Sequence, residues 1–196
     1  ALEEYPERED FLYLAGNIAE LLGDDDRAVS LYQRVLAIAA DHADALNSLG
    51  CVYERCDRLD DALVAFREAL RLKPREAQLE VNVGIILDKL GRTDEAERHF
   101  AVAMERGEDT AFAYNALGCH LAKSNRFEEA LAYFSKAVEL ETGNATYHRN
   151  LGLACEKMNL YDRAVQVYER MAAIDPQAAS MARERLSRLR SPIERV

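Results

Sequence analysis

Residues 46–74 read LNSLGCVYERCDRLDDALVAFREALRLKP, and the small and aromatic residues of this stretch recur along the whole chain. Gly50 is followed twelve residues later by Ala62 and four residues after that by Phe66. The same three residue classes return every 34 residues, and a fixed period of this size predicts a stacked array of small structural units. The recurring positions are Gly16, Gly50, Gly84, Gly118 and Gly152, then Ala28, Ala62, Ala96, Ala130 and Ala164, then Tyr32, Phe66, Phe100, Phe134 and Tyr168.

Each unit is predicted to form two helices, which makes the chain all-α. The first helix carries apolar residues at helical spacing, as at Leu46, Leu49 and Tyr53, and the second runs through Ala62 and Phe66. Between them every unit has a Gly, Asn or Asp, the residue types that best tolerate the left-handed conformation that closes a helix. These residues are Gly23, Asp57, Gly91, Asn125 and Asn159.

Two further expectations concern the second helix. An acidic residue three positions after each turn is predicted to be its N-cap, at Asp26, Asp60, Asp94, Glu128 and Asp162. The recurring Gly and Ala are predicted to let the two helices of a unit approach closely, with the aromatic ring filling the space toward the next unit. A bulky residue at Gly84 is therefore expected to destabilise the array.

Charge and composition exclude several classes of function. The 196 residues carry 35 Asp and Glu against 25 Lys and Arg, a formal charge of −10 with a pI near 5.0. Phosphates attract basic surfaces, so this balance argues against a nucleic-acid partner. No run of about 18 apolar residues occurs, so we expect no membrane span. The first ten residues are acidic and show no signal peptide, and we expect a cytoplasmic protein.

Cysteine and histidine spacing gives no sign of a metal or catalytic site. Cys51, Cys56, Cys119 and Cys155 form no Cys-x-x-Cys pair, and no His stands at zinc-finger spacing from them. The thiols are typical of a reducing compartment. His120 follows Cys119, but adjacent residues diverge on a helix and cannot form a nucleophile–base pair. We therefore expect no metal, no cofactor, no catalytic residue and no enzymatic activity.

The pattern resembles the tetratricopeptide repeat. The residues that carry the resemblance in the second unit are Leu46, Leu49, Gly50, Tyr53, Ala62, Phe66, Ala69 and Pro74, a complete set. Other units depart from it: Glu80 and His148 replace the first large residue, Ala15 replaces the Leu, and Glu108 and Thr142 replace the Pro. The resemblance implies a right-handed α-solenoid of antiparallel helix pairs.

The register divides the chain into five units with two flanking segments. The units are residues 9–42, 43–76, 77–110, 111–144 and 145–178. Ala1 and Pro6 match the motif of a preceding unit, so residues 1–8 are interpreted as the tail of a possible upstream repeat, the alternative being a native cap. Residues 179–196 are interpreted as a capping helix and tail, with Met181, Leu186 and Leu189 facing the array.

The resemblance also implies a concave groove lined by the first helix of each unit. The residues that it assigns to peptide binding are Tyr13, Asn17, Asn47, Cys51, Asn82, Ile85, Phe112, Asn115, Cys119, Arg149, Asn150 and Leu153. Every unit contributes one Asn, whose amide can both donate to and accept from a peptide backbone. Two interpretations stay open: the Asn side chains clamp a peptide, or they hold neighbouring first helices together.

The function expected is therefore a protein–protein interaction scaffold that binds a peptide or protein segment in the groove. One alternative is the repeat domain of a larger enzyme or signalling protein that recruits substrate protein. Another is a self-assembling scaffold. Relatives that bind chaperone C-termini use a five-residue clamp, of which only Asn17 matches here, so that partner is not expected.

Overall fold

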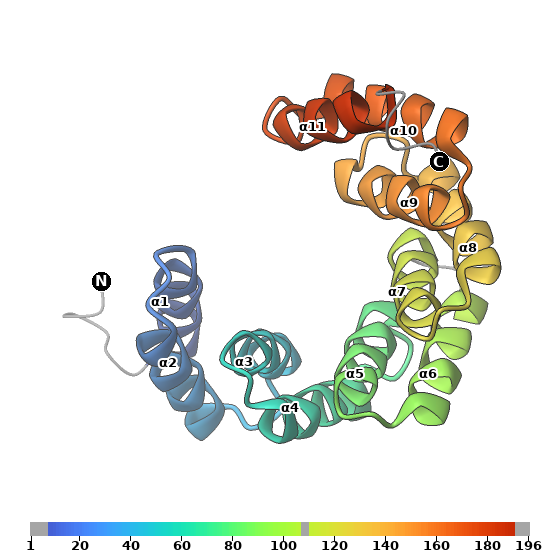
Figure 1. The fold of residues 1–196 in the computed structure, drawn as a ribbon. Coiled ribbons are helices and arrows are strands. Elements are labelled where there is room, and N and C mark those ends of the chain that lie inside the picture. Colours follow the sequence, from blue (N-terminus) through green and yellow to red (C-terminus); the bar gives the residue numbers. More distant parts are fainter. Residues whose placement is uncertain (1–7, 107–109, 191–196) are drawn as a thin grey trace. The chain divides into compact units, whose positions relative to one another are not determined.

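The computed structural model describes residues 8–106 and 110–190, which form eleven helices and no strand (Figure 1). The prediction of an all-α chain is confirmed. The helices are α1 (Glu9–Leu21), α2 (Asp25–Ile38), α3 (Ala43–Arg55), α4 (Leu59–Leu72), α5 (Ala77–Lys89), α6 (Thr93–Arg106), α7 (Thr110–Lys123), α8 (Phe127–Leu140), α9 (Ala145–Lys157), α10 (Tyr161–Ile174) and α11 (Ala179–Arg190). The upstream repeat inferred from Ala1 and Pro6 concerns residues outside this described part.

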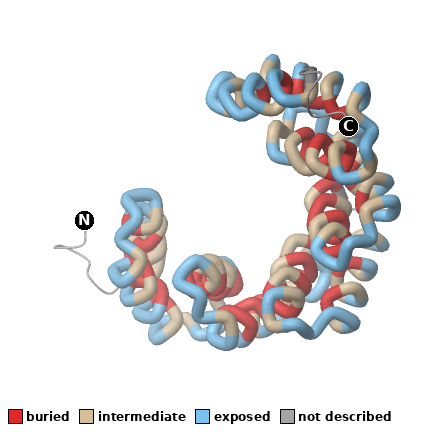
Figure 2. The backbone as a smooth tube through the Cα atoms, in the orientation of Figure 1, coloured by how far each residue is buried: buried red, intermediate tan, exposed pale blue. Residues whose placement is uncertain are grey.

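The chain divides into two compact units, residues 1–108 with α1–α6 and residues 109–196 with α7–α11. Within each unit every helix packs against the next one, and the first helices of successive repeats also touch, α1 with α3 and α7 with α9. The buried residues lie along the seams between these helices (Figure 2). Each repeat is thus a helix pair that completes its core against its neighbours.

The turns inside the repeats confirm the predicted helix-closing positions. Gly23 and Gly91 have φ of 75°, and Asp57, Asn125 and Asn159 have φ of 57–59°. A positive φ places each residue in the left-handed region, which Gly, Asn and Asp adopt at least cost. These residues end the first helix and allow the second to turn back on it after only a few residues.

The predicted N-caps of the second helices are wrong by two positions. Asp24 caps α2 through a hydrogen bond from the Arg27 amide at 3.2 Å, and α4 is preceded by Arg58, which makes no side-chain cap. Asp26 and Asp60 lie inside the first helical turn instead. Their charge still favours the positive end of the helix dipole, which explains why acidic residues recur there.

The recurring glycines make room for the aromatic ring of their own repeat. A methyl group built on Gly50 would lie 2.7 Å from the Phe66 ring, and one on Gly84 would lie 2.6 Å from the Phe100 ring. Each ring therefore packs against the glycine of its own repeat, and a side chain at the glycine would overlap the ring. The expectation that the ring also fills space toward the next unit stays a prediction.

The C-terminal helix α11 packs on α10, as a capping helix should. Ala182 is fully buried and Leu186 is 9% exposed, whereas Met181 is 40% exposed. Met181 lies at the edge of this contact, beside Met171 of α10, and the buried part of the contact comes from Ala182, which lies four residues before Leu186 and so shares its face of the helix. The predicted tail, residues 191–196, lies outside the described part.

Candidate functional site

All the residues predicted to bind a peptide lie on the first helices of the repeats, α1, α3 and α5 in one unit and α7 and α9 in the other. We call the surface formed by these helices within each unit the first-helix face. Contacts across it follow a simple rule: a side chain on one first helix meets the side chain 35 residues further on, as between Tyr13 and Ser48. This spacing is one repeat plus one residue.

The Asn residues obey this rule and bond to each other. The Asn82 amide nitrogen donates to the Asn47 carbonyl oxygen at 2.9 Å, and Asn150 donates to Asn115 at 2.8 Å. Asn82 also accepts from Gln78 at 3.0 Å. These amides therefore bridge neighbouring first helices, as in the packing interpretation, and a role in peptide binding stays a prediction.

The other predicted residues are placed differently. Asn17 accepts a hydrogen bond from the Tyr32 hydroxyl at 2.8 Å, within its own repeat. Burial raises the pKa of the Cys51 thiol to about 11, so this group is protonated at neutral pH. Ile85 and Phe112 are half-buried. Their binding role stays a prediction as well.

Replacing Asn150 by Ala is expected to lower the free energy of unfolding by about 1–3 kcal/mol, because it leaves the buried Asn115 oxygen without its donor. Urea denaturation followed by circular dichroism measures the change. Thr146→Ala, an exposed position on the same helix, is the matched control. Equal effects of the two substitutions would show that the amide pair contributes nothing.

Carboxylates and cations follow the same 35-residue rule two helical turns further along. The Arg55 guanidinium lies 3.1 Å from the Glu20 carboxylate and 2.6 Å from Asp25, and Lys89 Nζ lies 2.9 Å from Glu54. The Arg55 hydrogen bond lowers the pKa of Asp25. The residues of the first unit thus form a row of ion pairs between successive first helices.

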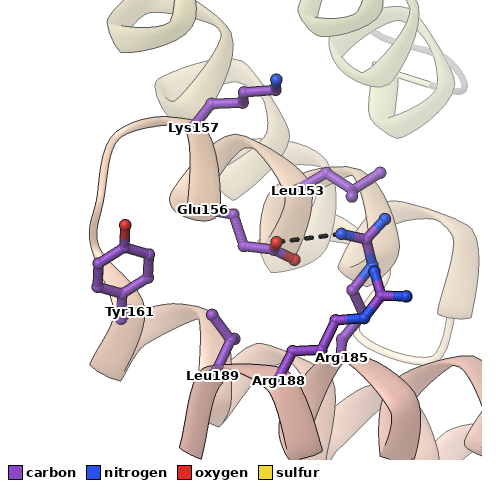
Figure 3. A pocket seen from close by; sticks show the side chains of 7 residues that line it. All are labelled: Leu153, Glu156, Lys157, Tyr161, Arg185, Arg188 and Leu189. Carbon is purple, nitrogen blue, oxygen red and sulfur yellow. Dashed lines mark hydrogen bonds and ion pairs between the residues drawn. The ribbon is translucent and has the colours of Figure 1, made fainter. Parts of the chain in front are cut away.

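The last repeat has a similar ion pair, whose cation comes from the capping helix. Glu156 on α9 accepts from Arg185 on α11 at 3.1 Å (Figure 3). It also accepts from the Tyr168 hydroxyl at 2.5 Å. Burial, with the bond to Glu156, raises the pKa of Tyr168 well above its ordinary value. In the first repeat the Tyr32 hydroxyl likewise donates a hydrogen bond to the Glu20 carboxylate, at 3.0 Å.

Two cavities open on the first-helix face of the second unit, one repeat apart. The first, of about 410 Å³, lies between α9 and α11 (Figure 3) and is lined by Leu153, Glu156, Lys157, Tyr161, Arg185, Arg188 and Leu189. The second, of about 450 Å³, lies between α7 and α9 and is lined by Cys119, Ala122, Lys123, Phe127, Phe134, Asn150, Leu153, Ala154 and Lys157. Each cavity has an aromatic residue, Phe127 or Tyr161, at the same position of its repeat.

Three of the predicted residues, Cys119, Asn150 and Leu153, line the cavity between α7 and α9. Arg149 does not: it lines a smaller hollow of about 220 Å³ together with Met171 and Met181. The prediction missed the cavity residues that follow the first helix or come from the capping helix. Two of the missed residues, Phe127 and Tyr161, are 34 residues apart, and this recurrence of an aromatic residue could have identified them from the sequence.

Within residues 8–106 and 110–190, no group of three His, Cys, Asp or Glu side chains is placed to hold a metal ion. All four cysteines lie in this part and are free thiols. No helix of the described part is long and apolar enough to cross a bilayer.

These features define a class of protein: an all-α array of helix pairs that bury their small and aromatic residues against one another. A family model described as the Cilia and flagella-associated protein 70 middle TPR-like domain matches residues 11–155, and a Tetratricopeptide repeat model matches residues 148–182. The chain belongs to the tetratricopeptide-repeat family. The predicted resemblance is confirmed.

Solved structures agree on the fold. A crystal structure of MamA is 21% identical, with a TM-score of 0.64 over 88% of this chain and 94% of that one. YrrB, described as a TPR protein with an unusual peptide-binding site, is 24% identical, with a TM-score of 0.59 over 93% and 95%. The APC/C hetero-tetramer Cut9–Hcn1 has a TM-score of 0.82 at 16% identity, but the match spans 39% of that chain. No curated protein matches the sequence.

Proposed function

We propose that this chain is a protein-interaction scaffold that binds a peptide or a protein segment on its first-helix face, in the second unit. The observation that carries the proposal is the pair of cavities, of about 410 and 450 Å³, in successive repeats. Each is large enough for one or more side chains, and Leu153 and Lys157 line both. A segment lying across α7, α9 and α11 would place side chains in both cavities.

The chemistry of the two cavities supports a peptide rather than a reactive substrate. Leu153 and Phe127 offer apolar surface, and Lys157 and Arg188 offer charge at the rim. Recognition of extended segments uses this combination, with apolar anchors for affinity and polar groups for orientation. YrrB, which shares the fold, is described as having a peptide-binding site.

The test selects peptides from a displayed library of random dodecapeptides on the wild-type chain and measures their affinity by fluorescence polarisation. Leu153→Arg should weaken the selected peptides at least about tenfold, because it puts a charge on the surface shared by both cavities. Leu140→Arg is the matched control, because Leu140 is 47% exposed and lines neither cavity.

Circular dichroism of both variants verifies that they remain folded. Peptides whose affinity is the same for the wild type and Leu153→Arg would place binding elsewhere. A selection that yields no peptide would overturn the proposed function.

A further inference from the structure

The fourth repeat lacks the carboxylate that forms an ion pair on the first-helix face of the first, second and last repeats. Glu20, Glu54 and Glu156 occupy the same position of their repeats, and each pairs with a cation of the next helix but one along the chain. The fourth repeat has Ala122 at that position. The cation 35 residues further on is Lys157, which makes no ion pair with any residue of the described part.

The Lys157 side chain lies next to Ala122, the position at which other repeats have a carboxylate. It is exposed, and it extends away from the Glu156–Arg185 pair (Figure 3). It also lines the cavity between α7 and α9, of which Ala122 is another wall. The cavity therefore lies where the ion pair of the other repeats would be.

The aromatic position of the fourth repeat carries no hydroxyl, as in the second and third repeats, which have Phe66 and Phe100. In the first and last repeats the ring is a tyrosine whose hydroxyl donates to the carboxylate, Tyr32 to Glu20 and Tyr168 to Glu156. The fourth repeat has Phe134, which lines the cavity. The fourth repeat thus combines an apolar ring with the loss of the carboxylate, next to a lysine that has no ion-pair partner among the described residues.

We propose that the space between Ala122 and Lys157 receives an acidic residue of a partner protein, whose carboxylate pairs with Lys157 while a neighbouring Leu or Phe side chain enters the apolar cavity. The partner thereby supplies the carboxylate that the fourth repeat lacks. This inference rests on the proposed function and names the chemistry of the peptide that would bind there.

Charge complementarity favours an acidic segment over a basic or neutral one. Lys157 lines the cavity, and no carboxylate is among the cavity's lining residues. A partner carboxylate paired with a cation at the edge of an apolar cavity is partly desolvated, which strengthens the pair relative to one in open solvent. The apolar side chain beside it adds the affinity of a buried anchor.

The decisive variant is Ala122→Glu, which restores the residue type of the other repeats. The introduced carboxylate should pair with Lys157, leave the thermal midpoint unchanged or higher, and close the site. The probes are the dodecapeptides selected above, synthesised with an acetylated N-terminus and an amidated C-terminus. We expect the selected sequences to contain Asp or Glu close to Leu or Phe, and Ala122→Glu to weaken them at least about tenfold.

Two controls separate this effect from general ones. Ala132→Glu adds the same charge at an exposed position of α8 and should leave peptide affinity unchanged. Replacing the peptide's Glu by Gln should weaken binding at least about tenfold to the wild type, and little to Lys157→Gln, because the pair is already absent there. Lys157 is exposed, so Lys157→Gln keeps the test valid even if Ala122→Glu does not fold.

The outcomes distinguish this inference from the function on which it rests. Peptides that are lost on Leu153→Arg but bind Ala122→Glu and Lys157→Gln normally would uphold the scaffold function and overturn the acidic partner. Peptides that bind only with a free C-terminal carboxylate would overturn the assignment of an internal acidic residue. A selection that yields no peptide overturns both.

Discussion

Replacing Gly84 by Leu is expected to lower the midpoint of thermal unfolding by about 6–12 °C, which corresponds to a loss of about 3 kcal/mol by overpacking. A β-carbon at this position would lie 2.6 Å from Cε1 and 2.9 Å from Cδ1 of the Phe100 ring. Phe100 is 1% exposed, so the ring has no free space into which it can move. Differential scanning calorimetry or thermal circular dichroism measures the shift.

Two further variants identify the ring as the cause. Gly84→Ala combined with Phe100→Leu should be less destabilised than the sum of the two single changes, because the smaller side chain leaves room for the new methyl group. Gly143→Leu is the matched control, since a β-carbon there has no atom within 4 Å. Similar midpoints for Gly84→Leu and Gly143→Leu would contradict the close approach of helix and ring.

Replacing Glu80 by Ala is expected to cost about 3 kcal/mol of folding free energy, because it leaves the Arg106 guanidinium without its carboxylate and His99 without its hydrogen-bond partner. The Glu80 carboxylate is 7% exposed and lies 2.6 Å from His99 Nδ1 and 2.8 Å from the Arg106 guanidinium. This value is at the lower end for a broken buried pair, since His99 and Arg106 keep 27% and 28% of their side-chain surface in water. Urea denaturation measures the loss.

The control is Glu68→Ala, which removes the exposed ion pair with Arg71 and should shift the urea midpoint little. Replacing Glu80, His99 and Arg106 together by Met, Leu and Met should recover most of the lost stability, because no charge is then left buried without a partner. A triple variant as unstable as Glu80→Ala would refute the orphaned charges as the cause.

This network also shows how the array accommodates a departure from its own motif. Glu80 stands where the second repeat has Leu46, a buried apolar residue. A lone carboxylate in that place would be costly, and the neighbouring helix α6 supplies His99 and Arg106 to satisfy it. The fourth repeat shows the opposite change, in which Ala122 takes the position held elsewhere by a paired carboxylate.

The sequence alone determined the repeat, the helix pairs and the turns between them. These features depend on backbone conformation and on residues within one unit, so the repeating residue pattern is enough to predict them. Asp57 and Asn125 adopt the left-handed conformation predicted for them, and Gly50 packs where only a glycine fits. Because the same residue types recur in five units, the position of each helix and turn could be predicted from the sequence.

Only the tertiary structure decided which side chains of neighbouring repeats meet. The contacts lie at a spacing of 35 rather than 34 residues, so the two residues that meet occupy different positions of their repeats. The predicted role of the Asn residues stayed open for this reason, and Lys157 was missed. A long side chain can reach several neighbours, and the packing of the helices selects the one with which it pairs. The 34-residue pattern therefore predicts the architecture, whereas the available cation beside Ala122 becomes visible only when successive helices are placed side by side.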